Sequence, residues 1–78
     1  MAWSPEQVEL ILERMRAGAT VRQGNTRCHQ TYYFRAGAWG YEEFDEGSGS
    51  RGTTSEASIR SLIERSPELF EAIVAQAE

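Results

Sequence analysis

The feature that most constrains this chain is a pair of tight turns that select the same apolar face of a sheet. Gly24-Asn25 and Ala36-Gly37 are typical of hairpin turns, and they separate β-favouring segments at about 19–23, 26–35 and 38–45. Because strand side chains alternate between faces, a one-residue change of register would reverse every assignment. Both turns independently predict a three-stranded antiparallel meander with one apolar face, made of Val21, Cys28, Tyr32, Phe34, Trp39 and Tyr41.

Closing the two turns also predicts the pairs of residues that lie opposite each other. The first turn sets Val21 opposite Cys28 and Arg22 opposite Arg27. The second turn predicts four further pairs, Phe34 with Trp39, Tyr32 with Tyr41, Thr31 with Glu42, and His29 with Phe44. Cys28, on the apolar side, is expected to be a small core residue rather than a reactive thiol.

Three helices are expected around this sheet. Ser4 and Gln7 form a capping box that opens a helix over about 4–17, and Gly18 ends it. A second capping box, Thr53 with Glu56, opens a helix over about 54–65. Ser66-Pro67 begins the last helix, over about 67–77.

A glycine-rich loop is expected at 46–52, between the third strand and the second helix. The 78 residues are enough for one small domain. The predicted fold is therefore a single α+β domain over 1–78, in the order α-β-β-β-α-α, with the helices packed on one face of the sheet.

Charge is distributed in three blocks along the chain. Residues 1–13 hold three glutamates and no base, 14–41 hold five arginines and no acid, and 42–78 hold nine acids and three arginines. The net charge of −4 therefore conceals a cationic middle segment. Such asymmetry indicates a binding surface, unless the acidic flanks fold back and neutralise it.

The predicted register gathers this positive charge on the sheet face opposite the core. Arginine suits phosphate or carboxylate groups, and tyrosine and histidine rings stack on bases. The face is therefore a candidate site for a protein or a nucleic acid, and the alternative is a face that only contacts water. Its candidate binding residues are Arg22, Arg27, His29, Tyr33 and Arg35.

An acidic run near the end of the third segment is a second candidate surface. A dense negative cluster can attract a basic protein by electrostatic competition with nucleic acid. The alternative is a set of solvated charges that confer solubility. The residues are Glu42, Glu43, Asp45 and Glu46.

The spacing Gly47-x-Gly49-x-x-Gly52 matches the glycine pattern of dinucleotide sites. That site requires a βαβ unit, and here a helix is expected to follow instead of a parallel strand. We therefore predict no cofactor. A looser anion-binding loop, formed by Arg51, Thr53 and Thr54, is the remaining alternative to a flexible tether.

No catalytic constellation is evident. Cys28 and His29 are adjacent in a strand, so they face opposite sides and cannot form a dyad. One cysteine and one histidine are too few for a zinc site, and the acids lack calcium-site spacing. We expect a non-enzymatic protein without a bound metal.

These observations favour a small binding module that modulates or inhibits a partner protein. Its size and acidity are similar to those of the inhibitors that phages and mobile elements encode, anti-CRISPR proteins included; the analogy rests on those two properties and no motif. A nucleic-acid-binding module is the alternative. An exposed edge strand or the final helix offers a route to a homo-oligomer. A cytoplasmic location is expected, because the chain shows no secretory signal or membrane span and holds a single cysteine.

Overall fold

Helix α1 (Pro5–Arg16) begins at the predicted cap. The Ser4 hydroxyl accepts a hydrogen bond from the Gln7 N–H at 3.2 Å, and the Gln7 side chain accepts one from the Ser4 N–H at 3.0 Å. The structure, a computed structural model, describes residues 2–77. One stripe of α1 is fully buried, because its apolar residues recur at helical spacing: Ile11, Leu12 and Met15.

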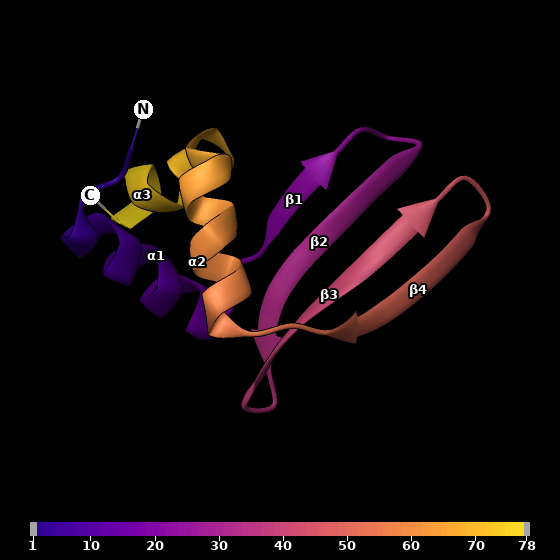
Figure 1. Cartoon of the computed structure of the whole chain (residues 1–78), viewed down its shortest axis with the longest axis horizontal. Helices are drawn as coiled ribbons and strands as arrows, with labels where there is room; N and C mark the ends of the chain where they lie inside the picture. The colour runs from indigo at the N-terminus through magenta and orange to yellow at the C-terminus, as the bar shows by residue number, and fades with distance from the viewer. Residues whose placement is uncertain (1, 78) are drawn as a thin grey trace.

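The sheet has four antiparallel strands, in the spatial order of the sequence (Figure 1). They are β1 (Val21–Gly24), β2 (Cys28–Arg35), β3 (Ala38–Asp45) and β4 (Ser48–Thr53). The α+β class with an antiparallel sheet is confirmed, and the number of three strands is wrong. The β2–β3 register is as predicted, with Phe34 opposite Trp39 and Tyr32 opposite Tyr41.

Strand β4 occupies most of the segment that was expected to be a glycine-rich loop at 46–52. A tight turn with positive φ at Glu46 (24°) and Gly47 (97°) reverses the chain and lets β4 pair with β3. Within β4, glycine is needed at position 52, opposite Tyr41 of β3. A Cβ on Gly52 would lie 2.7 Å from the Tyr41 hydroxyl, because that side chain lies over the glycine. The low apolar content of β4 hid it from a reading based on hydrophobic alternation.

The β1–β2 hairpin closes at a different place from the predicted turn. The Asn25 side chain accepts hydrogen bonds at 2.9 Å from the N–H groups of Arg27 and Cys28, and this widens the connection. Val21 therefore lies opposite Tyr32, not Cys28, and Arg22 lies opposite Thr31, not Arg27. The shift is an even number of residues, so the face assignments survive.

The second half of the helical layer consists of α2 (Glu56–Arg65), the 3₁₀ helix η1 (Pro67–Phe70) and α3 (Glu71–Ala77). The predicted Thr53 cap for α2 is wrong, because Thr53 still belongs to β4. Ser55 caps the helix instead, and its hydroxyl accepts from the Ser58 N–H at 3.2 Å. None of the helices within residues 2–77 is long and apolar enough to cross a membrane.

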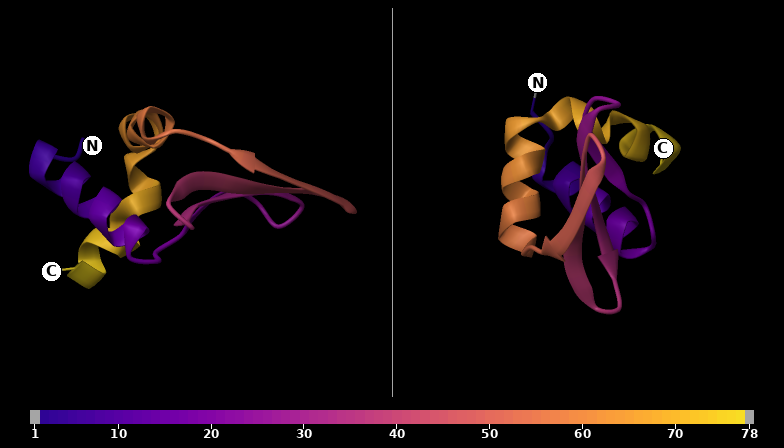
Figure 2. Two further views of the ribbon diagram at one scale, coloured as in Figure 1. Left: turned by 90° about the horizontal axis from the view of Figure 1, so that it is seen from below. Right: turned by 90° about the vertical axis from the view of Figure 1, so that its right-hand side faces the viewer.

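The hydrophobic core lies at one end of the sheet, where the helices pack (Figure 2). Among residues 2–77, the strands contribute Val21 and Trp39 to the buried hydrophobic core, with Tyr32 and Phe34 packed beside them. The opposite end of the sheet projects beyond the helices, and the molecule measures 38 × 27 × 20 Å. Cys28 lies on this projecting end and is exposed, so its predicted place in the core is wrong.

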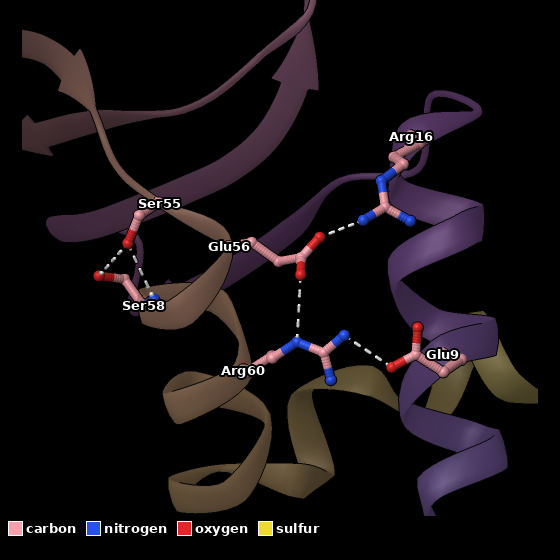
Figure 3. A network of polar contacts seen from close by, with 6 residues as sticks. All are labelled: Glu9, Arg16, Ser55, Glu56, Ser58 and Arg60. Atoms are coloured by element: carbon pink, nitrogen blue, oxygen red, sulfur yellow. Dashed lines mark hydrogen bonds and ion pairs between the residues drawn. The ribbon is translucent and has the colours of Figure 1, made fainter.

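An ion-pair network joins α1 to α2 at the surface (Figure 3). Arg60 lies 2.7 Å from a Glu9 oxygen and 3.3 Å from a Glu56 oxygen, and Arg16 pairs with the other oxygen of Glu56. The hydrogen bond with Glu9 is the main reason that the pKa of Arg60 is raised. Because all four side chains are substantially exposed, the network orients the helices more than it stabilises them.

Candidate functional site

The face of the sheet opposite the helices, called here the cationic face, carries arginine and aromatic side chains from all four strands. Alternation along each strand and the observed register define its members. One row across the sheet runs Arg22–Thr31–Glu42–Arg51, and the next row toward the projecting end runs Gly24–His29–Phe44–Gly49. Tyr33 and Arg35 lie on the same face at the other end.

His29 and Phe44, on the two central strands, form a pair of stacked rings in the row of this face nearest the projecting end. Their ring centroids are 5.1 Å apart and their planes differ by 21°. Phe44 is 40% exposed, the largest exposure of any large apolar side chain among residues 2–77. Glycines stand on both sides of the pair in its row, so no neighbouring side chain in that row covers the rings. The stack is therefore open to a planar ligand.

The His29 ring is anchored by the same loop that sets the β1–β2 register. Its Nδ1 lies 3.1 Å from the Asn25 carbonyl oxygen. Because a carbonyl oxygen only accepts, Nδ1 carries the hydrogen in this contact, and Nε2 keeps its hydrogen-bonding capacity for a ligand.

The arginines of the cationic face differ in how their charge is used. The Arg35 guanidinium lies over the Tyr33 ring, 4.2 Å from its centroid, and 3.5 Å from a Glu42 oxygen. Arg22 and Arg51 lie at the two ends of one row, about 14 Å apart by strand spacing. Within residues 2–77 neither makes an ion pair. They are the cations of this face that remain available to an anionic ligand.

A shallow hollow covers these groups. It has a volume of about 680 Å³, and its lining includes residues of all four strands. The unpaired arginines, the stacked rings and the paired Glu42 therefore meet in one concavity: Arg22, His29, Glu42, Phe44 and Arg51.

The acidic run does not form one surface. Glu42 lies on the cationic face, whereas Glu43 and Asp45 face the opposite side, because they are one residue out of step. Glu43 accepts a hydrogen bond from the Gln30 side chain at 2.9 Å, and Glu46 lies in the β3–β4 turn. The sheet thus separates part of the charge, with the strand arginines on one face and two of these four acids on the other.

Two other predicted groupings are also divided. Arg27 is exposed in the β1–β2 loop and does not lie on a strand as predicted. In the predicted anion loop, Arg51 and Thr53 share a face of β4, whereas Thr54 lines a cleft beneath α2 on the other side. Four of the five predicted cationic-face residues do share that face. His29, Tyr33 and Arg35 lie on β2, and Arg22 lies on β1 in the row between those of His29 and Tyr33.

Sequence reasoning placed Phe44 opposite His29, which the structure confirms, but did not count it among the binding residues, and it missed that Arg51 belongs to the same site. A usable signal was present. Closing a hairpin on Glu46-Gly47 sets Glu42 opposite Arg51, a favourable charge pairing, and places glycines opposite Tyr41 and Phe44.

The Cys28 thiol at the projecting end is hydrogen-bonded to a carboxylate. Its Sγ lies 3.1 Å from an Asp45 oxygen, and this hydrogen bond is the main reason that the pKa of Cys28 is raised. A raised pKa means less thiolate, and hence a weaker nucleophile, at neutral pH. Within residues 2–77 no three His, Cys, Asp or Glu side chains gather as metal ligands.

Replacing Asp45 by alanine is expected to lower the pKa of Cys28 and speed its reaction with a disulfide reagent at pH 8. The rate against pH would show its midpoint at lower pH in D45A than in the parent chain. Glu46→Ala is the matched control, because Glu46 does not contribute to the shift. Equal midpoints in D45A and the parent would contradict this account of the thiol.

Comparisons with known protein families, with curated proteins and with solved structures find no match to this chain.

Proposed function

We propose that this chain is a small non-enzymatic binding module whose cationic face binds single-stranded nucleic acid. The observation that carries the proposal is the open stack of His29 and Phe44, with the unpaired Arg22 and Arg51 in the adjacent row. Aromatic rings stack on any base, and flanking arginines neutralise the phosphates of the same strand.

The separation of charge supports an anionic ligand despite the net charge of −4. Glu42 is the one acid that the four strands, all within residues 2–77, place on the cationic face, and Arg35 already pairs with it. Glu43 and Asp45 lie on the far side of the sheet. A nucleic-acid strand on the cationic face is therefore separated by the sheet from Asp45, whereas Glu43 still borders the hollow.

The proposal predicts binding that weakens with salt. A labelled oligothymidylate, followed by fluorescence anisotropy, is expected to lose about 7- to 18-fold in affinity between 50 and 200 mM salt if two or three phosphates are neutralised. Phe44→Ala is expected to reduce affinity by about 5- to 150-fold, the loss of one base stack.

Charge variants distinguish binding at the cationic face from a general attraction of nucleic acid to any arginine. Arg22→Ser and Arg51→Ser each remove one unpaired arginine from the cationic face, and each is expected to weaken binding. Arg14→Ser removes the same charge from exposed α1 and is expected to bind like the parent. Affinity that ignores salt, or equal losses in R14S and R22S, would contradict the proposal.

A protein partner that this module modulates or inhibits is the second candidate. The observation that favours it is the projecting end of the sheet, which is exposed on both faces and carries arginines on one and acids on the other. An arm of this shape can enter a cleft on a partner. The analogy with phage- or mobile-element-encoded inhibitors belongs with this candidate.

Affinity purification distinguishes the two candidates. If a protein is the ligand, a specific partner is captured by the parent chain and lost after charge reversal of the arginines or of Glu42, Glu43, Asp45 and Glu46. Capture that is unchanged in both sets of variants would rule out this surface as a protein-binding site.

A further inference from the structure

The outer edge of β4 presents unpaired backbone groups. The Thr54 N–H donates to the Trp39 carbonyl at 3.1 Å, which continues the β3–β4 ladder. Because the N–H and C=O of successive strand residues point to alternate sides, the even-numbered residues of β4 bond to β3. The N–H and C=O of Gly49, Arg51 and Thr53 therefore point outward, along an edge that no strand within residues 2–77 covers.

This edge is suited to strand pairing, and the opposite edge is not. β4 is six residues long, consists mainly of glycine, serine and threonine, and has no proline, lysine or bulge to block a neighbour. β1 has four residues, and η1 lies against it. Any extension of the sheet is therefore expected on the β4 side.

We propose that a second copy of this chain pairs with this edge, antiparallel, with Ser50 on the two-fold axis. An axis perpendicular to the sheet keeps each face on its own side, so the axis must pass through a residue that pairs with its own copy. Centring on Arg51 would set two arginines directly opposite each other, which is unfavourable. Centring on Ser50 sets each Arg51 opposite Gly49 of the second copy, and these two residues exchange their outward hydrogen bonds.

The resulting eight-stranded sheet would join the two cationic faces into one surface. Gly49 has no side chain, and its neighbour on β3 is Phe44. Arg51 would therefore lie beside the Phe44 ring of the second copy, where a cation and an aromatic face attract each other. All helices would remain on the other side of the extended sheet. This inference goes beyond the proposed function and does not depend on it.

Disulfide trapping tests the register, in a chain whose own cysteine is replaced (Cys28→Ser). Ser50 pairs with Ser50 of the second copy at a position without mutual hydrogen bonds, where the two Cα atoms approach to about 4.5 Å. This separation suits a disulfide. Mild oxidation of Ser50→Cys is therefore expected to give mainly a covalent dimer on a non-reducing gel.

Two matched variants control for random collision. In the proposed register Ser48 lies opposite Gly52 of the second copy, so the two Ser48 residues are far apart. Ser48→Cys and Arg51→Cys are therefore expected to form no disulfide under the same oxidation and to run as single chains on the non-reducing gel. Equal cross-linking at all three positions, or a dimer dominated by R51C, would overturn the proposal.

Sedimentation without nucleic acid tests the association itself. The parent chain is expected to show a mass that rises from monomer to dimer with concentration. Arg51→Pro removes one outward N–H without breaking a bond to β3, and it is expected to stay monomeric, while Arg51→Ala keeps the N–H and still dimerises. A parent chain that stays monomeric at every concentration would overturn the dimer, whatever the nucleic-acid titrations show.

Discussion

Phe70→Ala is expected to lower the free energy of unfolding by about 3–5 kcal/mol. Phe70 is 0% exposed and packs in the core formed by the helices and the covered end of the sheet. Truncation removes its transfer energy and leaves a cavity that the surrounding helices can fill only in part. Because a chain of this length has about 4–12 kcal/mol of stability in all, the variant is expected to lose between about a quarter and all of it.

Urea unfolding followed by circular dichroism measures this effect. Phe44→Ala is the matched control, because it makes the same chemical change at a side chain that is 40% exposed. It is expected to change stability by less than about 1 kcal/mol. Similar losses of unfolding free energy in F70A and F44A would contradict the conclusion that the hydrophobic core is confined to the end of the sheet covered by the helices.

Gly24→Ala is expected to destabilise the fold by at least about 2 kcal/mol, although the glycine is exposed. Its φ is +114°, in a region that side chains rarely adopt. An added Cβ would also lie 2.3 Å from the Cys28 carbonyl oxygen and 2.9 Å from the His29 Cα. Both contacts are with backbone, so the β1–β2 hairpin itself must shift.

Gly37→Ala is the control for conformation alone. Gly37 also has a positive φ, +79°, but an added Cβ would meet nothing within 4 Å. Its expected cost is about 1 kcal/mol, from the left-handed conformation. The urea midpoint of G24A should therefore lie below that of G37A, and the reverse order would show that close approach at Gly24 does not constrain the hairpin.

The elements that the sequence predicts well are those whose determinants are local. The α1 cap uses two side chains three residues apart, and the β2–β3 register follows from one two-residue turn. Both are interactions between near neighbours, which a pattern can record. The apolar periodicity of α1 and α2 likewise identifies the buried stripe of each helix.

The errors have physical causes that periodicity does not reveal. The Asn25 side chain bonds the loop backbone and displaces the β1–β2 pairing by an even number of residues. Gly52 of β4 leaves room for the Tyr41 ring of β3, and the rest of β4 is mainly small and polar, so the strand has almost no hydrophobic signal of its own. The candidate site was therefore only partly predictable: Arg22, His29 and the pairing of His29 with Phe44 were found, whereas the grouping with Arg51 required the fourth strand.

The extension of the sheet past its helical cover divides the chain into residues that fold it and residues that face outward. Substitutions at exposed positions away from caps, turns and buried contacts usually change stability by less than about 0.5 kcal/mol. The side chains at positions 22, 29, 31, 44 and 51 are outside the buried hydrophobic core, so they can be exchanged for others with little penalty. Gly24, Asn25 and Gly47 are different, because they shape the backbone that presents those side chains. The five side chains can thus vary while the helical core and the turns stay unchanged. A library randomised at those five positions should yield mostly folded proteins with altered ligand preference.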